Sequence, residues 1–326
     1  MSLINSDLYS QDCGTKMTNQ QKEYFNTNKT NRKLHQRSDS NIMYFPVQNH
    51  ILTENNCSWN INTLTVSEIE QIMSQLNTHY FNSGIQFFQY SEPNIICDSE
   101  NYNFTSNNET VCDIHDISNV INIYFVNTIT NPSTGNELCG YAYLPGFYSL
   151  DRILMSNNCA RNGSTIIHEM GHYFSLLHTH ETAYGIEYVN GSNCTFAGDE
   201  ICDTPADPNL LFEESYLVDN ECNYTGTNVD PNGDTYSPST INFMSYSKKD
   251  CRTNFSEEQL NRLNYSALNE RNYLNYYNQV IGCTNPSAAN YNPNANTDNG
   301  LCVEYTDSLN MSLLSNLIYD SSTSQY

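Results

Sequence analysis

The stretch "STIIHEMGHYFSLLHTHE", residues 164–181, places four histidines and two glutamates within eighteen residues. His168 and His172 lie four residues apart, so on a helix they occupy one face. Two imidazoles in that relation can bind one zinc ion at about 2.0–2.1 Å each. Glu169 directly follows His168, where its carboxylate can take a proton from a water on the metal. The His-Glu-x-x-His spacing therefore predicts a zinc site with a general base beside it.

A catalytic zinc ion usually takes three protein ligands and keeps a fourth position open. We expect His178 to be the third ligand, provided that the helix ends near Ser175 and the chain turns back. His180 is a weaker candidate for the same role. The competing interpretation is a helix whose histidines bind no metal. A third histidine at this offset makes a chance match rare, so we favour the zinc site.

The charge of the chain limits the classes of partner. The chain has 326 residues and a formal net charge of −23, with only 13 lysines and arginines. Such a surface repels phosphate groups, so nucleic acids and anionic membranes are poor candidate partners. No run of 18 apolar residues is present, so we expect no membrane span. The excess of carboxylates is compatible with bound calcium.

The chain contains twelve cysteines, spread from Cys13 to Cys302 and not grouped as Cys-x-x-Cys pairs. An even number of scattered cysteines predicts disulfides in an oxidising compartment, and disfavours zinc ribbons and thioredoxin-like chemistry. We therefore expect a secreted protein. The first residues, "MSLINSDLYSQDCG", have neither the basic nor the apolar region of a signal peptide, so we expect that the signal is not part of this sequence. A cytosolic protein with twelve thiols is the less favoured alternative.

Hydrophobic periodicity predicts an N-terminal half in which strands alternate with one long helix and then with the histidine helix. The helix is expected at residues 65–81, with Ser67 and Glu70 as a capping box and Gly84 after its end. Its predicted inner face consists of Ile69, Ile72, Met73, Leu76 and Tyr80. The predicted strands are residues 42–52, 85–90, 120–126, 138–146 and 152–156.

After residue 181 the chain is irregular and rich in Asp, Gly, Pro and Cys. Regular structure is expected again at residues 256–274, as a helix capped by Ser256. The leucines of this helix that we expect to face inward are Leu260, Leu263 and Leu268.

These patterns divide the chain into four parts. Residues 41–281 form the main domain, and residues 282–302 form a small Asn-rich unit closed by two cysteines. Residues 1–40 are polar, lack clear periodicity, and are interpreted as a flexible lead-in or pro-segment. Residues 303–326 are a polar tail with no assigned role.

With His178 included, the motif becomes HExxHxxxxxH and resembles that of the metzincin metallopeptidases. The resemblance is closest to the pappalysin/cytophagalysin family and covers roughly residues 40–275. The other stretches that carry it are "GYAYLPG" at 140–146, "GDEICDTPADP" at 198–208 and "NFMSYSKKDCRTNFSEEQ" at 242–259. It implies an α+β fold with two lobes, in which a twisted mixed sheet and the active-site helix precede an irregular, disulfide-linked lower lobe.

The resemblance also implies roles for the histidine helix. His168, His172 and His178 would be the zinc ligands, and Glu169 would be the general base. Metzincins usually have glycine three residues after the second histidine, where the helix ends in a turn with positive φ. This chain has Ser175 there, and a side chain at positive φ is costly but tolerated.

Two further residues receive roles from the resemblance. Met244 would be the Met-turn residue beneath the metal. Tyr246 would reach toward the metal and stabilise the oxyanion, because a hydroxyl donor aimed at developing negative charge is effective in a dry site. Ordinary core packing is the alternative for both.

The resemblance favours particular disulfides, although twelve cysteines allow very many connectivities. The expected pairs are Cys194–Cys222, Cys202–Cys251, Cys139–Cys159 and Cys283–Cys302. The small unit resembles a Cys-bounded, Asn/Asp-rich motif appended to secreted bacterial proteins. We favour a stapled loop there over a weak calcium site.

The stretch "DCGT", residues 12–15, leaves two alternatives open. Some pappalysin-like enzymes have a similar Cys-Gly near the start of a pro-segment, where the thiolate occupies the open zinc position. Under this interpretation Cys13 is a switch, Gly14 lets the backbone approach the metal, and cleavage before about residue 40 activates the enzyme. Cys57 would then be the other unpaired cysteine. The alternative is a Cys13–Cys57 disulfide.

The predicted function is that of a secreted zinc metalloendopeptidase. Its peptide substrate would lie extended in the cleft and pair with the edge strand at residues 138–144. One alternative is a catalytically silent, disulfide-rich binding protein with a metzincin fold, although the presence of both Glu169 and Tyr246 disfavours it. Another is a zinc hydrolase of non-peptide amides.

Overall fold

The computed structural model describes residues 13–37, 42–146, 151–212, 215–274, 281–293, 295, 297–298, 300 and 302–303. The chain divides into two compact units, Met1–Tyr277 and Asn278–Tyr326. The predicted tail, residues 303–326, lies outside the described residues apart from its first position. The second unit contains β12 (Ile281–Gly282) and β13 (Thr297–Asp298), joined in parallel and closed by the Cys283–Cys302 disulfide.

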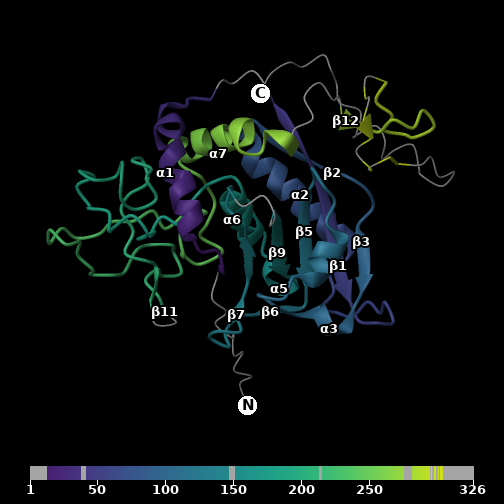
Figure 1. The fold of residues 1–326 in the computed structure, drawn as a ribbon, viewed down its shortest axis with the longest axis horizontal. Coiled ribbons are helices and arrows are strands. Elements are labelled where there is room, and N and C mark those ends of the chain that lie inside the picture. The colour runs from purple at the N-terminus through teal and green to yellow at the C-terminus, as the bar shows by residue number, and fades with distance from the viewer. Residues whose placement is uncertain are drawn as a thin grey trace. The chain divides into compact units, whose positions relative to one another are not determined.

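The first unit is built around a six-stranded mixed sheet (Figure 1). Its main path runs β2-β1-β5-β9-β8, and β3 also pairs with β1. All of these pairings are parallel except that of β8 with β9. The strands are β1 (Met43–Thr53), β2 (Ile85–Gln89), β3 (Asn94–Cys97), β5 (Ile121–Val126), β8 (Gly140–Ala142) and β9 (Arg152–Ser156). The short antiparallel strand β8 therefore forms one edge of the sheet.

Both faces of this sheet are buried, because alternate residues of its central strand enter different cores. Ile123 and Phe125 of β5 pack in the core that contains α2 (Val66–Tyr80) and α6 (Ser164–Tyr173). Tyr124 and Val126 pack on the opposite face. A smaller sheet, β4 (Asn103–Thr105), β6 (Thr128–Thr130) and β7 (Glu137–Leu138), contributes to that second core together with α3 (Ser99–Tyr102) and α4 (Thr110–His115).

The predicted helix at residues 65–81 is α2, and its five predicted inner residues are buried. Its capping box was predicted two residues too late. Thr65 and Glu68 form the box, because Thr65 is the last residue with extended backbone before the helix. A short 3₁₀ turn, η1 (Phe81–Ser83), follows, and Gly84 ends it at φ 75° as expected.

The predicted strand at residues 138–146 is interrupted. Leu138 belongs to β7, whereas Gly140 begins β8 in the main sheet. Cys139 lies between them and forms a disulfide with Cys159 of α5 (Asn157–Ala160). The two half-strands join different sheets, so the chain changes layers at this disulfide.

The C-terminal helix of the first unit is α7 (Glu257–Asn269), followed by η2 (Asn272–Leu274). Leu260 and Leu263 are buried as predicted, but Leu268 is 36 % exposed. Ala267 faces the core in its place, because it lies four residues after Leu263 and Leu268 is rotated one further position around the helix.

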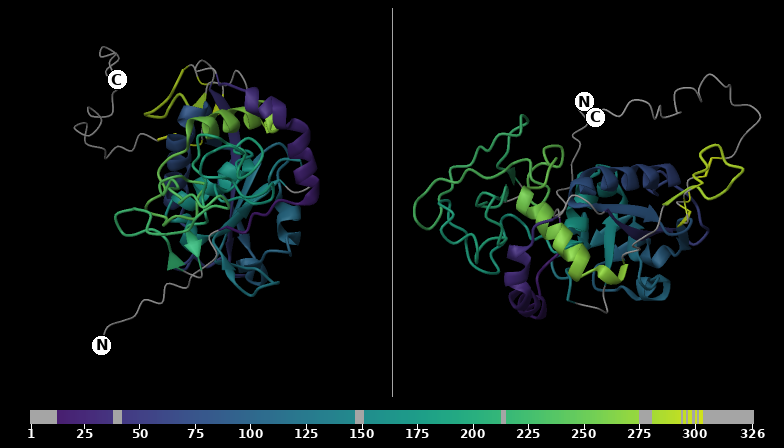
Figure 2. Two further views of the ribbon diagram at one scale, coloured as in Figure 1. Left: turned by 90° about the vertical axis from the view of Figure 1, so that its left-hand side faces the viewer. Right: turned by 90° about the horizontal axis from the view of Figure 1, so that it is seen from above.

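Residues 13–37 are not featureless, contrary to the flexible lead-in that their polarity suggested. They contain α1 (Asn19–Leu34), which begins with a capping box between Thr18 and Gln21. Phe25 is fully buried against Leu144 and Leu177. Figure 2 shows α1 in purple beside α7, and side chains of α1 and of the residues that follow it reach α7.

The chain between α6 and α7 has little regular structure, as predicted. Its only strands among the described residues are β10 (Leu211–Phe212) and β11 (Ser215–Tyr216). Two disulfides stabilise it, but the expected pairing was wrong. The structure pairs Cys194 with Cys202 and Cys222 with Cys251, at Cα separations of 5.1 Å and 5.6 Å. Both separations fit disulfide geometry, and the local loop around Gly198 brings the first pair together.

The remaining cysteines also differ from the expectation. Cys57 pairs with Cys97, so it is neither unpaired nor bonded to Cys13. Cys139–Cys159 and Cys283–Cys302 pair as expected. All twelve cysteines lie within the described residues, and Cys13 and Cys112 are the two free thiols among them. None of the helices in the described part of the chain has the length and apolar character that a membrane crossing requires.

Candidate metal centre

Helix α6 places the first two histidines in the interior of the unit. All ten of its residues are buried, between the edge of the main sheet and the irregular lower half. The helix begins after Gly163, whose φ of 77° turns the chain out of α5, and the side chain of Asn162 accepts the N–H of Thr165. Tyr80 of α2 donates its hydroxyl to the carbonyl of Ile167 at 2.9 Å, which fixes α6 against α2.

Three imidazoles converge beside α6. The Nε2 atom of His172 lies 3.1 Å from the Nε2 atoms of both His168 and His178. The Nδ1 atom of His168 lies 2.6 Å from the carbonyl oxygen of Phe243, and that of His172 lies 2.7 Å from the carbonyl oxygen of Leu176. A carbonyl can only accept, so in these two rings Nδ1 carries the proton and Nε2 presents a lone pair.

Burial keeps the three rings neutral. It lowers the pKa of His168 and of His178 well below the ordinary value, with the neighbouring histidines as the next cause. It lowers the pKa of His172 to about 4. Neutral imidazoles whose lone pairs face one another have no proton to share, and a divalent cation satisfies all of them. The donor set therefore fits zinc.

The turn after α6 delivers the third imidazole. Ser175 has φ 74°, the positive value expected at this position. The N–H of Leu176 then donates to the carbonyl of Gly171 at 2.9 Å, and the N–H of Thr179 donates to the carbonyl of Met244 at 3.1 Å. His178 is thereby brought back toward His172. His180 is not in the group of converging ligand atoms, and its ring instead stacks on that of His178 with centroids 4.9 Å apart.

Met244 and Tyr246 lie next to the three histidines. Met244 is fully buried, and a Cβ atom added at Gly171 of α6 would lie only 2.6 Å from its sulfur. Glycine at position 171 therefore permits the close approach of Met244 to the helix. The ring centroid of Tyr246 lies 4.8 Å from that of His178 and 6.2 Å from that of His168. Its hydroxyl donates to the carbonyl oxygen of Cys13 at 3.1 Å.

Cys13 is the fourth member of the group of side chains that could hold a metal ion. Its sulfur and one nitrogen of each of His168, His172 and His178 all lie within 4.8 Å of one another. The thiol also donates to Oε2 of Glu169 at 3.4 Å. Burial, and next the charge of Glu169, raise the pKa of the Cys13 thiol well above its ordinary value.

Residues 13–15 lie against the edge strand β8. The N–H of Gly14 donates to the carbonyl of Gly140 at 2.8 Å, and the hydroxyl of Thr15 accepts the N–H of Ala142 at 2.9 Å. The same hydroxyl lies 3.2 Å from Oε2 of Glu169. Sequence reasoning missed the part played by Thr15, because a single threonine carries no recognisable pattern.

Comparisons with known proteins agree with this arrangement. The sequence profile of the peptidase M43 family, described as pregnancy-associated plasma protein-A, matches residues 103–269, just over half of the chain. The chain belongs to the peptidase M43 family. The match includes α6 and extends through Met244 and Tyr246 to the end of α7.

Curated relatives of this M43 chain include two proteins named extracellular metalloprotease from Colletotrichum graminicola. One is 29 % identical over 158 residues, which cover 44 % of this chain and 48 % of the relative. The other is 28 % identical over 165 residues, which cover 46 % of this chain and 49 % of the relative. The chain thus spans about half the length of the curated relatives it matches.

Two solved structures share the fold of this M43 chain. A mutant of Tannerella forsythia promirolysin aligns with a TM-score of 0.54 at 18 % identity, covering 81 % of this chain and 97 % of that one. Mature mirolysin from the same organism, in complex with a cleaved peptide, aligns with a TM-score of 0.50 at 18 % identity, covering 73 % and 97 %. The family and these likenesses confirm the predicted two-lobed, α+β metzincin fold.

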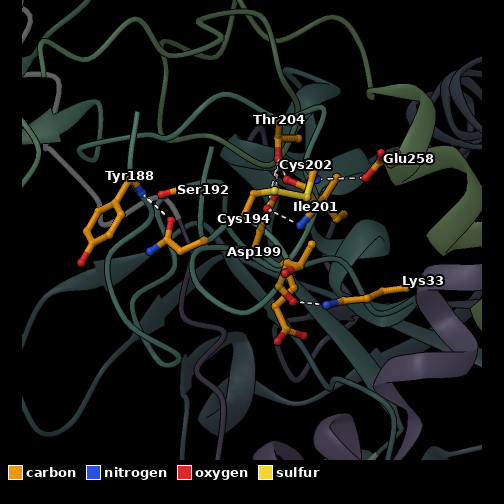
Figure 3. Close-up of a disulfide and its surroundings, with 12 residues drawn as sticks. Lys33, Tyr188, Ser192, Cys194, Asp199, Ile201, Cys202, Thr204 and Glu258 are labelled. Atoms are coloured by element: carbon orange, nitrogen blue, oxygen red, sulfur yellow. Dashed lines mark hydrogen bonds between the residues drawn. A yellow bond between two sulfur atoms is a disulfide. The ribbon is translucent and has the colours of Figure 1, made fainter. Parts of the chain in front are cut away.

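A second group of buried acids lies in the lower half of the M43 domain. Asp199 accepts the N–H of Ile201 and the hydroxyl of Thr204, both at 3.0 Å, beside the Cys194–Cys202 disulfide (Figure 3). Glu187 is buried, and its Oε2 has no hydrogen-bond partner among the described residues.

Burial and neighbouring acidic side chains disfavour the ionisation of both carboxyl groups. Burial, and next the charge of Asp207, raise the pKa of Glu187 to about 7. Burial, and next the charge of Glu187, raise the pKa of Asp199 well above its ordinary value. Sequence composition indicated an excess of carboxylates but did not identify these two residues.

Proposed function

We propose that this chain is a secreted zinc-dependent endopeptidase whose N-terminal segment keeps it latent. The observation that carries the proposal is the convergence of Cys13, His168, His172 and His178 within 4.8 Å. His168, His172 and His178 are the proposed zinc ligands in every state. Cys13 is the proposed fourth ligand in the latent state only.

The chemistry follows from the groups around the three histidines. A zinc ion bound there would act as a Lewis acid toward the scissile carbonyl and would lower the pKa of water. Glu169 is buried beside the site and is the proposed general base, which takes a proton from the attacking water and returns it to the departing amine nitrogen. Tyr246 is the proposed donor of a hydrogen bond to the oxyanion.

The substrate is proposed to bind as an extended peptide along β8. The carbonyl of Gly140 and the N–H of Ala142 are both bonded by residues 13–15 in this structure. A peptide that replaced these residues would find the same backbone groups free, and main-chain pairing to a sheet edge is a general mode of peptide binding.

Latency is proposed to come from the same three residues of the N-terminal segment. The Cys13 sulfur lies among the proposed zinc ligands, and the Cys13 carbonyl accepts the Tyr246 hydroxyl. The Cys13 thiol and the Thr15 hydroxyl both hydrogen-bond to Glu169. Zinc deprotonates a coordinating thiol, so metal binding reverses the effect of burial on the Cys13 pKa. Cleavage before about residue 40 would release the segment and free the ligand, the base and the oxyanion donor together.

The proposal also includes secretion of the protein and a calcium site. Five disulfides and the extracellular relatives support secretion. Calcium is proposed near Glu187 and Asp199, because the buried Oε2 of Glu187 accepts no hydrogen bond from the described residues and a hard divalent ion would satisfy it. The proposed calcium site has no part in the chemical step.

The decisive experiment measures zinc and peptide cleavage together. The purified full chain should contain about one zinc ion, and a peptide library should be cleaved only after removal of the N-terminal segment. A zinc chelator should abolish that cleavage. A chain that binds zinc but cleaves no peptide would favour the alternative of a catalytically silent binding protein with a metzincin fold. A chain that cleaves only non-peptide amides would favour the alternative of a zinc hydrolase of such amides.

A further inference from the structure

Glu270 lies at the C-terminal end of α7 and is buried next to the turn that follows α6. Its Oε2 accepts a hydrogen bond from the hydroxyl of Ser175. The Ser175 hydroxyl also lies 3.0 Å from the hydroxyl of Ser266, one turn earlier in α7. The other carboxylate oxygen, Oε1, accepts Nε of Arg32 from α1 at 2.9 Å. The two oxygens of one buried carboxylate thus hold two different segments.

Ser175 needs such a restraint because of its backbone conformation. Its φ of 74° lies in the left-handed region, which favours glycine and disfavours a residue with a Cβ atom. Left to itself, a serine there would relax toward negative φ. The hydrogen bond to Glu270 ties the side chain to α7 and so opposes this relaxation.

The conformation of Ser175 matters for the histidines on both sides of it. The next residue, Leu176, presents the carbonyl that accepts Nδ1–H of His172 at 2.7 Å. His178 lies three residues after Ser175, and its Nε2 atom is 3.1 Å from Nε2 of His172. A change in φ at Ser175 would rotate that carbonyl and displace His178, so two of the three proposed ligands depend on this turn.

The neighbouring Arg271 supports the same end of α6. Its Nε donates to the carbonyl of Tyr173, the last residue of α6, at 3.0 Å. Its guanidinium carbon lies 3.9 Å from the centre of the Tyr173 ring. Glu270 and Arg271, which directly follow α7, therefore hydrogen-bond to the last residue of α6 and to the turn after it.

We propose that Glu270 is a positioning residue of the metal centre. It acts through Ser175, because its hydrogen bond stabilises a positive φ that a glycine at position 175 would adopt without help. This inference rests on the proposed zinc site. It predicts that Glu270 is required only because position 175 is serine, so a glycine at position 175 should remove the requirement.

The test is a double-mutant cycle in the full chain with the variants E270A, S175G and S175G/E270A. Loss of the Arg32 partner occurs in both E270A variants, so it cancels in the cycle. E270A should speed zinc transfer to a chelator by roughly tenfold or more, the usual effect of removing a group that orients a ligand. S175G/E270A should recover most of that loss. The single variant E270Q should transfer zinc more slowly than E270A, because its amide oxygen can still accept the hydrogen bond from Ser175.

Glu257 supplies the matched control. It is another carboxylate of α7 that pairs with the N-terminal segment, through Arg37 at 2.6 Å, and it lies at the opposite end of the helix from Glu270. E257A should leave zinc transfer unchanged. If E270A transfers zinc at the wild-type rate, or if S175G/E270A is as impaired as E270A, the proposal is overturned.

The same cycle can be followed without metal. The thermal unfolding temperature of the zinc-free protein should fall further when E270A is introduced into the wild type than when it is introduced into S175G. The strain at position 175 exists before zinc binds, and the loss of the Arg32 partner is common to both backgrounds. If E270A does not fold, recovery of a folded protein by S175G supports the proposal, and failure to recover contradicts it. A wild-type chain that binds no zinc would instead contradict the proposed function, which the zinc-free cycle does not depend on.

Discussion

The hydroxyl of Tyr246 donates to the carbonyl oxygen of Cys13 at 3.1 Å, although the two residues are 233 positions apart. The group proposed to stabilise the oxyanion is thus bonded to the residue proposed to block the metal. The same segment also bonds the proposed base, Glu169. The proposed latency and the proposed catalysis therefore involve the same atoms, and substitutions can test each of them separately.

Zinc binding should depend on His172. His172→Ala should lose the zinc ion, because Nε2 of His172 lies between the other two imidazoles at 3.1 Å from each. Metal analysis of the purified variant measures this. His180→Ala is the control, and it should keep about one zinc ion because His180 is outside the ligand group. Full zinc content in His172→Ala would remove this residue from the site.

Cleavage should depend on the carboxylate of Glu169. Glu169→Gln should keep zinc but lower kcat by about 10²-fold or more, because an amide cannot accept the proton of the attacking water. The measurement compares peptide turnover and metal content after removal of the N-terminal segment. Near-normal turnover would show that another group is the base.

Tyr246→Phe should change kcat more than KM. A hydrogen bond made mainly in the transition state gives this signature, and its removal lowers kcat by about 10²-fold. Steady-state kinetics of the activated variant measure both constants. An unchanged kcat would return Tyr246 to a packing role.

Cys13→Ala should give a full chain that cleaves peptides without prior removal of the N-terminal segment. The thiol would no longer occupy the proposed metal position, and Glu169 would lose the hydrogen bond from that thiol. The backbone carbonyl that accepts the Tyr246 hydroxyl would remain. Cys112→Ala is the matched control, since Cys112 is the other free cysteine and lies buried near Arg152, away from the histidines. It should remain latent. Mass mapping of the unreduced chain should show Cys13 as a free thiol.

The pH dependence of stability should reveal Glu187. Its pKa in the folded protein is about 7, above its ordinary value of 4.5, so the folded state holds the proton more tightly. Its contribution to the free energy of unfolding is therefore fully present below about pH 4.5 and is lost as the pH rises to about 7.

The measurement is thermal unfolding against pH for the wild type and Glu187→Gln, with and without calcium. Without calcium, the wild type should lose stability across this range relative to Glu187→Gln. Calcium should remove that loss in the wild type only. If calcium has no effect on either protein, the proposed calcium site is wrong.

Local features of the fold could be predicted from the sequence. The inner face of α2 and the convergence of His168 and His172 follow from helical geometry alone, since residues four apart lie on one face. The positive φ of Ser175 followed from the family resemblance. Leu268 was misplaced because the periodicity of α7 admits two neighbouring inner positions, and packing in the core shared with α2 and α6 selects Ala267.

Features that depend on the path of the chain could not be predicted. The lower-lobe disulfides were wrong because Cys194 has several partners at plausible separations, and only the loop around Gly198 brings Cys202 within reach. The order of residues 13–37 depends on burying Phe25 and on pairing Arg32 with Glu270. No local pattern in a polar segment indicates such distant partners.

The Cys139–Cys159 disulfide links the start of β8 to α5, which leads directly into α6. One covalent bond therefore sets the separation between the strand that is proposed to hold the peptide and the helix that carries the proposed catalytic groups. In a reducing cytosol this link would be absent, and the width of the cleft would rest on packing alone. Under the proposed function, we expect the cleft to reach its final dimensions only after export. Redox conditions would then limit the proposed peptidase activity inside the producing cell, in addition to the proposed block by Cys13.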